Sequence, residues 1–590
     1  MKNTNFFALF LLLILCISTS CKKTEGEFNV QFSSEWKILT GVEPDSAWNQ
    51  LQFDDSDWVV IDNDKSFAEQ GFKLVHHKGY YRKTIELPDS VIEEAQKFGG
   101  AKLHLGAFFN ADKTWFNGVL IGETGILGEE YGGYMKWARD YFLPDSLLKS
   151  GENLIAIAFD GGWTGAGLVT GSRLAVSVGE ISNIDCFITA DDSDYVFLSP
   201  QNATISARVV NRNQHTVNET FTIIIKSDAV IGNKTVFQDA QTFSVEGGKE
   251  TTATLSWNDP QPGVYQVLTS IKHHNRVIFD KKFNIVYEPE KIISPADGQP
   301  DLKEFWQKSL AELAAVQPDY QLVEQPELSN ENYTVYIVNM RSYGNEPICG
   351  YYAKPTREGK FPAIVQYMGY NAQPTPPDTA WNGYATFILS VRGQGLNDSM
   401  LVKGESTKNT WFSKGVGDKE TYYYHGAFLD AVRAIDFVCS REEIDTERIV
   451  VSGGSQGGTL TLAAAALDKR VKAAAPIIPF SDFPDFFKPI IWPRIELVAY
   501  RWKHWGTTWK DLYKTLSYFD VKNLAEWIEC PVLMSFGVQD PLCTPHVNFA
   551  VYNNIKSPKS WVANAEYGHS TAKTFYQDAD MFFAKQLAEE

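Results

Sequence analysis

The sequence lacks the cysteine pattern of a metal-binding or disulfide-stapled protein. Its 590 residues include seven cysteines, which are widely scattered and contain no CxxC pair. This spacing argues against structural zinc and against a dense disulfide framework. The chain also lacks an excess of positive charge, since 54 basic and 72 acidic residues give a net charge of −18. A field of that sign repels phosphate backbones, so we expect no nucleic-acid partner.

Long apolar runs are missing after the first twenty residues, and crossing a bilayer takes about twenty apolar residues. The apolar run at residues 6–17 is shorter, follows one lysine and ends in small residues, which is typical of a signal peptide. We predict that residues 1–20 form this signal. Cys21 then resembles the lipid-modified cysteine of a bacterial lipoprotein, although Ser18 stands where such signals usually carry leucine.

The predicted anchor at Cys21 sets the expected location of the protein. An anchored chain lies in the cell envelope, in the periplasm or on the outer-membrane surface, and touches the membrane only through its lipid. A plain secretory signal with an incidental cysteine is the alternative, and it predicts a secreted protein.

The length of 590 residues predicts three or four domains of about 100–200 residues each. With 44% hydrophobic and 21% charged residues, the chain has the composition of a globular protein. Aromatic residues make up 13%. That fraction is compatible with carbohydrate binding, because sugar faces stack on aromatic rings, and equally with the aromatic-rich cores of large β-sandwiches.

Residues 21–185 carry the pattern of many short strands separated by Gly and Pro turns, which predicts a β-sandwich or jelly roll. Asn117-Gly118 between two of these strands is a strong hairpin signal. The expected strands lie at residues 81–87, 101–105, 113–116, 119–121 and 153–159.

Three pieces of this segment resemble the galactose-binding-like jelly roll at the start of family 2 glycoside hydrolases. They are FDDSDW at 53–58, WFNGVLIGE at 115–123 and LPDSLLKSGENLIAIAF at 143–159. In that family the domain binds sugar or only packs beside the catalytic domain. The resemblance therefore leaves both sugar binding and a structural role open for residues 21–185.

Residues 186–290 predict a smaller sandwich, and about 100 residues of this pattern fit an immunoglobulin-like module. Prolines at 260 and 262 mark turns between its strands. No chemistry is visible in this segment, so we expect it to space or pack the others. The expected strands lie at residues 203–210, 219–225, 250–257 and 264–271.

Residues 291–590 alternate apolar strands with helices, which predicts a parallel sheet covered on both faces. The predicted helices are residues 301–313, 423–439 and 456–467, and the predicted strands are residues 361–367, 384–391, 448–452, 532–536 and 560–563.

A GxSxG sequence at residues 453–457 places Ser455 between the strand at 448–452 and the helix at 456–467. That strand–turn–helix context is the one that the nucleophile elbow of an α/β-hydrolase requires. The glycines permit a tight turn that a Cβ would block, and the turn lifts the serine hydroxyl above the sheet edge. Ser455 is therefore the predicted nucleophile.

A serine nucleophile needs a base and a group that orients the base, and in this fold they follow in the order acid, then histidine. Asp540 stands in the loop after the strand at 532–536 and is the predicted acid. His569 lies in a short loop before the last helix and is the predicted base. His546 comes only six residues after Asp540, which leaves little chain to reach back.

The tetrahedral intermediate of acyl transfer needs hydrogen-bond donors for its oxyanion. The backbone N–H after the nucleophile, that of Gln456, is one predicted donor. The second is expected in the loop after the strand at 361–367, where the backbone N–H of Tyr370 is the candidate; its side chain is otherwise a pocket wall.

Several stretches in this order resemble the acetyl xylan esterase and cephalosporin C deacetylase family, carbohydrate esterase family seven. They are FWQKSLAEL at 305–313, RGQG at 392–395, YYYHGAFLDAVRAIDFV at 422–438, GGSQGG at 453–458 and YGH at 567–569. The resemblance implies an α/β-hydrolase fold, deacetylation of sugars or small esters, and the same triad and oxyanion donors. It implies no metal and no cofactor.

Three positions depart from the family pattern. Met368 replaces a histidine in the oxyanion loop, His425 replaces an arginine, and Ser570 replaces a glutamate after the catalytic histidine. None removes a catalytic group, but they bear on substrate range and packing. The family typically forms a hexamer without leading domains, so the added sandwiches leave the oligomeric state open.

An aromatic stretch lies between the nucleophile helix and the acid, with Trp492, Trp502, Trp505 and Trp509. We interpret Trp492 and Trp502 as candidate walls of the substrate pocket or sugar-stacking rings, with a packed cap core as the alternative. Arg392 is expected to be a structural ion-pair partner rather than a substrate ligand.

Together these patterns predict two N-terminal β-sandwich domains followed by a C-terminal α/β-hydrolase domain. The expected function is a serine carboxylesterase that removes O-acetyl groups from plant-type polysaccharides or oligosaccharides through an acyl-enzyme. One alternative is a serine hydrolase for other acyl esters, lactones or peptides. The other is a carbohydrate-binding surface lipoprotein whose hydrolase domain is degenerate.

Overall fold

The computed structural model describes residues 21–588 apart from short segments at 25–26, 73–77, 133–137, 163–164, 200, 229, 231, 378–382, 401–409 and 490. The predicted signal peptide at residues 1–20 lies outside the described residues. Cys21 begins strand β1 (Cys21–Thr24), and its lipid remains a prediction. In the segments that are described, no helix has both the length and the apolar character needed to cross a membrane.

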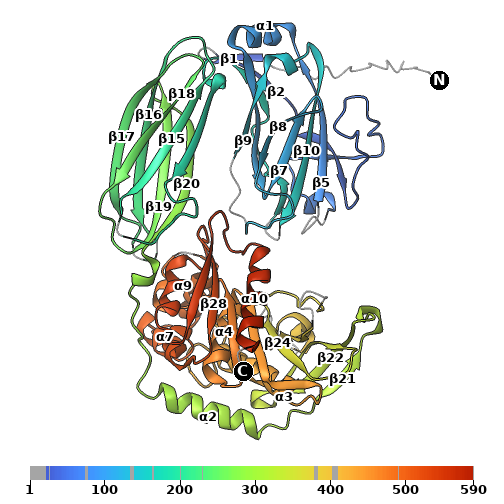
Figure 1. Cartoon of the computed structure of the whole chain (residues 1–590), viewed down its shortest axis with the longest axis vertical. Coiled ribbons are helices and arrows are strands. Elements are labelled where there is room, and N and C mark those ends of the chain that lie inside the picture. Colours follow the sequence, from blue (N-terminus) through green and yellow to red (C-terminus); the bar gives the residue numbers. More distant parts are fainter. Residues whose placement is uncertain are drawn as a thin grey trace, which may run out of the picture.

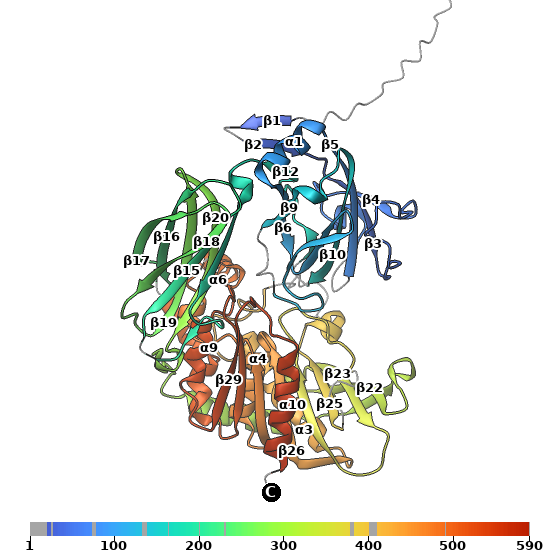
Figure 2. The same ribbon diagram turned by 45° about the horizontal axis from the view of Figure 1, so that its top comes forward.

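The chain forms three units, and two β-rich units lie side by side against the same side of an α/β unit (Figures 1 and 2). We call them the N-terminal unit (residues 21–183), the middle unit (184–287) and the C-terminal unit (288–588). The prediction of a β-rich N-terminal part and an α/β C-terminal part is confirmed.

The twelve strands of the N-terminal unit are all linked by pairing: nine form a continuous path and three are attached to it, and the sheet folds over so that both halves share one core. Val30, Trp36, Tyr81, Leu103 and Val176 from the two halves pack together in that core. All five strands predicted here lie within observed strands, but helix α1 (Asp89–Phe98) was not predicted. The strands after β1 are β2 (Glu27–Gln31), β3 (Glu35–Thr40), β4 (Val59–Asp62), β5 (Lys78–Leu87), β6 (Gly100–Phe109), β7 (Asp112–Phe116), β8 (Val119–Thr124), β9 (Ala138–Pro144), β10 (Gly151–Gly162), β11 (Gly165–Leu168) and β12 (Ala175–Val178).

The middle unit packs a three-stranded sheet, β13-β15-β18, against a five-stranded sheet, β14-β20-β19-β16-β17. Its core continues into the C-terminal unit, because Phe536, Phe549 and Tyr552 belong to the same buried cluster as Phe221 and Val267. The strands are β13 (Ile184–Ala190), β14 (Val196–Phe197), β15 (Ala203–Asn211), β16 (Val217–Ser227), β17 (Thr235–Val245), β18 (Lys249–Trp257), β19 (Gly263–His273) and β20 (Arg276–Tyr287).

The C-terminal unit is built on a nine-stranded sheet of order β21-β22-β23-β25-β24-β26-β27-β28-β29. The pairs from β25 through β29 are parallel, but β21, β22 and β23 pair antiparallel. The strands predicted for this unit all lie in the parallel part of the sheet, and the three antiparallel strands at the other edge were not predicted. The strands are β21 (Gln321–Glu324), β22 (Tyr333–Arg341), β23 (Pro347–Pro355), β24 (Phe361–Tyr367), β25 (Ala385–Ser390), β26 (Ile444–Gly454), β27 (Val471–Ile477), β28 (Val532–Gly537) and β29 (Lys559–Asn564).

Helices cover both faces of this sheet because side chains along each strand point alternately to opposite faces. Val365 and Val451 pack on the face of α2 (Leu302–Ala315), α3 (Tyr423–Cys439) and α4 (Gln456–Leu467). Their neighbours Ile364 and Val450 pack on the opposite face with α10 (Thr574–Ala588). The parallel strands thus end at one edge, where loops can bring side chains together.

A buried ion pair organises the part of the N-terminal unit nearest to that edge. Arg139 Nε lies 2.6 Å from Asp112 Oδ1, and neither side chain is exposed. Arg139 Nη2 also donates to the carbonyl of Asn110 (2.6 Å), and the Asn110 amide bonds the backbone of Glu129 (2.9 Å) and Tyr131 (3.0 Å). The pair therefore supports the loop at residues 126–132.

We predict that Asp112→Ala destabilises the protein by about 3–5 kcal/mol, because it removes the carboxylate that balances the charge of the buried Arg139 guanidinium. Denaturant unfolding of the full chain measures the loss. Glu123→Ala is the matched control, since it breaks only the exposed Lys113–Glu123 pair and is expected to cost at most about 1 kcal/mol. Equal losses in the two variants would contradict the prediction.

Candidate active site

The chain reverses direction at Ser455, between β26 and α4. Ser455 has φ 57° and ψ −117°, a conformation that side-chain-bearing residues rarely adopt. A Cβ at Gly457 would collide with the carbonyl oxygen of Tyr367, and one at Gly453 would lie 2.5 Å from the same atom. Only glycine fits at these two positions, so the sequence pattern is a steric requirement of the turn.

The structure brings Ser455, His569 and Asp540 into one hydrogen-bonded row. His569 Nδ1 lies 2.8 Å from Asp540 Oδ2, and His569 Nε2 lies 2.9 Å from Ser455 Oγ. The other carboxylate oxygen of Asp540 accepts the backbone N–H groups of Leu542 (2.8 Å) and Cys543 (3.0 Å). Asp540 is fully buried, and these bonds fix its orientation toward the imidazole.

Backbone bonds within the C-terminal unit hold the His569 loop beside the Asp540 loop. The N–H of Gln539 donates to the carbonyl of Tyr567 (2.9 Å), and that of Val538 to Asn564 (3.1 Å). The Asn564 side chain donates to Phe536 (3.0 Å) and accepts from Ala572 (3.0 Å). Several hydrogen bonds therefore connect the two loops.

The loop at residues 126–132 of the N-terminal unit also contacts the His569 loop. The N–H of Gly568 donates to the carbonyl of Tyr131 (2.9 Å), and the Tyr567 hydroxyl donates to Glu129 (2.8 Å). The rings of Tyr131 and Tyr567 lie 4.7 Å apart. Burial and the Glu129 carboxylate raise the pKa of the Tyr567 hydroxyl, so it stays a donor.

Gly132 allows the two loops to approach this closely. It has φ 60°, and a Cβ there would lie 2.6 Å from the backbone nitrogen of His569. A side chain at this position would therefore push on the residue that carries the imidazole.

The middle unit makes a comparable contact with the Asp540 loop. The N–H of Asn284 donates to the side chain of Gln539 (2.7 Å), and the Asn284 amide donates to the carbonyl of Val538 (3.2 Å). The Tyr195 hydroxyl donates to Glu566 (2.8 Å), just before the His569 loop. Both β-rich units thus touch the loops that carry the acid and the base.

The two predicted oxyanion residues, Tyr370 and Gln456, are linked through Gln394. The Gln394 side chain accepts the backbone N–H of Asn371 (2.8 Å) and donates to Gln456 Oε1 (3.2 Å). Tyr424 donates to the same Gln456 oxygen (3.0 Å). These buried side-chain hydrogen bonds therefore fix the loop after β24 relative to the start of α4.

The Tyr370 side chain is anchored by a buried carboxyl group. Its hydroxyl donates to Glu496 (2.7 Å) and accepts from the N–H of Trp411 (2.9 Å). The other Glu496 oxygen accepts the N–H of Phe412 (2.9 Å). Burial raises the pKa of Glu496 to about 7.

Of the two predicted pocket tryptophans, the structure places only Trp492 beside Tyr370. Trp492 begins α6 (Trp492–Lys503), its ring lies 4.6 Å from that of Tyr370, and it is 41% exposed. Trp502 lies ten residues further along α6, roughly 15 Å away at 1.5 Å per residue, and is 78% exposed. Its interpretation as a pocket wall is therefore unsupported.

The departures from the family pattern fall mainly in packing positions. His425 is part of α3, and its side chain faces α2. Its Nε2 lies 2.8 Å from the Ser309 hydroxyl, and burial lowers its pKa to about 4. Met368 is buried at the start of the loop after β24. Arg392 pairs with buried Asp430 through two bonds of 2.6 and 2.7 Å, so its structural role is confirmed.

Two clusters in the described part of the chain have the donor types of a metal site. One is Asp540, Cys543 and His569, but Asp540 and His569 already hydrogen-bond each other, and His569 also bonds Ser455. The other is Asp482, Asp485 and His546. Lys522 lies 2.9 Å from Asp482 and Lys488 pairs with Asp485, so ammonium groups already balance these carboxylates.

The sequence did not point to Glu496, Glu129 or Gly132. Glu496 has no motif around it, and its position in an amphipathic helix gives no sign that it is buried. The contact between loop 126–132 and His569 joins segments more than 400 residues apart. Only Gln394 carried a signal, through the RGQG stretch at 392–395.

We predict that Glu496→Gln changes the pH dependence of stability. Between about pH 4.5 and 7 the folded state keeps the Glu496 proton while the unfolded chain loses it, so wild-type stability falls as pH rises. Relative to the Gln variant, the wild type should lose of the order of 3 kcal/mol across this window. Denaturant unfolding at several pH values measures the difference, and a constant difference would contradict the assignment.

Comparison with known proteins supports one family. Residues 287–587 match the family described as acetyl xylan esterase (AXE1). The acetyl esterase Axe7A of Xylanibacter ruminicola is 27% identical over 337 residues, covering 54% of this chain and 73% of that protein.

Two solved acetyl xylan esterases are also similar. The one from Paenibacillus sp. R4 is 32% identical, with 50% of this chain and 98% of that chain covered and a TM-score of 0.46. The one from Thermoanaerobacterium sp. is 29% identical, with 51% and 98% covered and a TM-score of 0.47. The family match spans half of the chain and contains the whole row of Ser455, His569 and Asp540. The chain therefore belongs to the acetyl xylan esterase family and is a carboxylic ester hydrolase.

Proposed function

We propose that the protein removes O-acetyl groups from acetylated plant-type polysaccharides or oligosaccharides through a serine acyl-enzyme. The observation that carries this proposal is the hydrogen-bonded row of Ser455, His569 and Asp540 within an acetyl xylan esterase match. No metal or cofactor takes part in the proposed steps.

In the first step Ser455 Oγ attacks the acetyl carbonyl carbon, and His569 Nε2 takes the hydroxyl proton. The tetrahedral intermediate collapses, the bond from the acetyl carbon to the sugar oxygen breaks, and His569 returns the proton to that oxygen. Water then attacks the acetyl-serine, again giving a proton to His569, and acetate leaves as Ser455 regains its proton. Asp540 keeps the imidazole in the tautomer with hydrogen on Nδ1.

The developing oxyanion is stabilised in this proposal by the backbone N–H groups of Tyr370 and Gln456. Such donors are effective only if they are in place before the reaction. The Gln394 link and the Glu496 anchor of Tyr370 supply that fixed geometry.

The contact of loop 126–132 has a mechanistic role in the same scheme. Catalysis depends on sub-ångström placement of the base relative to the nucleophile, and His569 lies in a loop rather than on a helix or strand. The Gly568–Tyr131 and Tyr567–Glu129 bonds restrict that loop from outside the C-terminal unit.

We predict that Ser455→Ala lowers acetate release from acetylated xylan and from an aryl acetate by about 10⁴-fold or more. The side chain removed is the one that forms the acyl-enzyme, so both substrates should be affected alike. Chromatographic quantification of acetate measures the rate.

Asp540→Asn is the companion variant, with an expected loss of about 10⁴-fold in kcat. A Ser455→Ala protein that hydrolyses the aryl acetate near the wild-type rate would refute the triad. An active wild type that prefers butyrate esters, lactones or peptides over acetylated glycans would keep the triad and refute the substrate.

We predict that Gly132→Ala lowers kcat for the aryl acetate about 10-fold or more while the protein remains folded, because the added Cβ displaces the His569 backbone. Gly171→Ala is the matched control, since Gly171 also has positive φ (74°) in the N-terminal unit but nothing within 4 Å of its Cβ position. Equal kcat values in the two variants would show that the contact does not position the base.

A further inference from the structure

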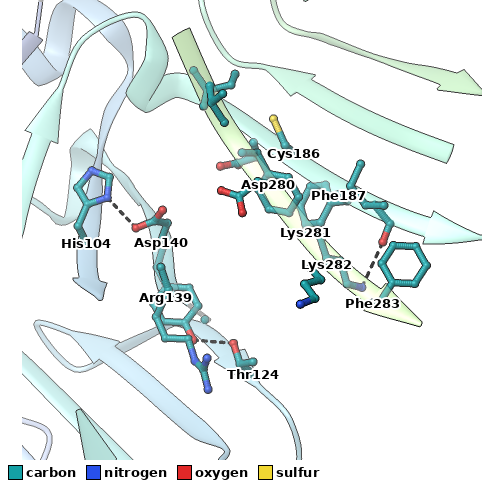
Figure 3. Close-up of a pocket in the computed structure, with 18 of the residues that line it drawn as sticks. His104, Thr124, Arg139, Asp140, Cys186, Phe187, Asp280, Lys281, Lys282 and Phe283 are labelled. Carbon is teal, nitrogen blue, oxygen red and sulfur yellow. Dashed lines mark hydrogen bonds and ion pairs between the residues drawn. The ribbon is translucent and has the colours of Figure 1, made fainter. Parts of the chain in front are cut away.

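A large cavity lies where the three units meet. Its volume is about 1690 Å³, which exceeds the roughly 300–1,000 Å³ of pockets that hold drug-sized ligands. Figure 3 shows two facing walls, with His104, Arg139 and Asp140 on one side and Phe187 and Lys282 on the other. We call this space the interunit cleft.

Strand edges form both walls. On the N-terminal side these are β8, whose described partner is β7, and β9, whose described partner is β6. On the middle side they are β13, at the end of its sheet, and β20, which pairs with β14 only at residues 286 and 287. Edge strands present backbone donors and acceptors in alternation, a surface suited to a ligand rich in hydroxyl groups.

The charges that line the interunit cleft nearly cancel. Seven Lys and Arg residues face six Asp and Glu residues, although the whole chain carries −18. A polyanion or polycation would find no complementary field there. The lining therefore favours a polar, uncharged ligand.

Aromatic rings occur on both walls between the charged groups. Tyr141 and Phe142 belong to β9, and Phe187 and Phe279 belong to β13 and β20. Phe187 is 43% exposed. Guanidinium groups lie over the Phe187 and Phe142 rings at 4.2 and 4.3 Å. The remaining exposed surface of such rings can contact the C–H faces of sugars while the neighbouring polar groups bind the hydroxyls.

One end of the interunit cleft is lined by Asp540 and by neighbours of other active-site residues. Pro541 follows Asp540 directly, Pro489 lies just before Trp492, and Gly132 adjoins the His569 backbone; Pro541, Pro489 and Gly132 all line the cleft. The two walls are also hydrogen-bonded to the catalytic loops, through Tyr131–Gly568 and Asn284–Gln539. The walls of the interunit cleft are thus fixed relative to the loops that carry Asp540 and His569.

We propose that the interunit cleft binds several residues of the neutral glycan chain whose acetyl groups are removed at Ser455. This inference rests on the proposed function and gives it a substrate class: a polymer or long oligosaccharide rather than a small acetate ester. The two β-rich units then act as one glycan-binding surface, with a wall from each.

The test combines binding and turnover in the full chain. Phe187→Ala and Leu120→Ala remove exposed side chains from opposite walls of the cleft, since Leu120 is 48% exposed on β8. Val236→Ala on β17 is the matched control, because Val236 is 45% exposed in the middle unit but does not line the cleft.

Turnover is compared on an acetylated xylohexaose and on p-nitrophenyl acetate. We expect Phe187→Ala and Leu120→Ala each to raise KM for the hexaose about fivefold or more while leaving kcat and the aryl acetate unchanged. Val236→Ala should change neither substrate. Unchanged KM in both cleft variants, or an equal change in Val236→Ala, would overturn the proposal.

Binding separates this proposal from the proposed function. Calorimetric titration of Ser455→Ala protein with deacetylated xylohexaose needs no turnover, and we expect binding that 0.5 M NaCl changes less than twofold. Binding that is lost in Phe187→Ala supports the cleft even if the wild type releases no acetate. No binding up to millimolar hexaose, or binding that salt weakens tenfold as for a charged peptide, would overturn the glycan assignment while leaving the esterase mechanism untouched.

Discussion

The backbone bond from Gly568 to Tyr131 is the interaction on which the arrangement of this protein depends. It joins the loop of His569 to a loop of the N-terminal unit, and the Tyr567–Glu129 hydrogen bond and the Tyr131–Tyr567 ring contact strengthen the same junction. A buried network stands behind each partner: Asp112, Arg139 and Asn110 on one side, Asn564 on the other. The bond therefore connects two rigidly packed regions beside His569 and restricts the position of its imidazole.

The loop that carries Asp540 is held by a similar contact. Asn284 of the middle unit bonds Gln539, the residue before Asp540, and the core of the middle unit continues into β28 and α9 (Pro545–Tyr552). The loops that carry His569 and Asp540 are thus both held by contacts with the β-rich units. The turn at Ser455 is instead fixed locally, because a Cβ at Gly453 or Gly457 would collide with the carbonyl oxygen of Tyr367.

Local signals made the α/β part predictable. The helices at 423–439 and 456–467 and the strand at 361–367 were predicted to the residue, because each is an apolar run with clear limits in the sequence. Ser455, Asp540 and His569 followed from the order that this fold imposes on its loops. Short amphipathic strands such as β21 and β22 carry a weaker pattern, and the antiparallel edge was missed.

Contacts between segments far apart in the chain could not be predicted from the sequence. Nothing near residues 126–132 distinguishes that loop from any other surface loop, and its role depends on a partner 438 residues away, as in the Glu129–Tyr567 bond. The exposure of Trp502 was equally hidden, since aromatic composition does not reveal which face of α6 meets a neighbour. Such features depend on how finished units pack, which a single sequence does not encode locally.

The shared core of the middle and C-terminal units has a consequence for dissecting the molecule. Phe536, Phe549, Tyr552 and Trp561 are covered by side chains of the middle unit. A C-terminal unit expressed alone would present these rings to water as one apolar patch, and patches of this kind drive association. In this chain, the region that matches the family therefore shares part of its core with residues that precede it.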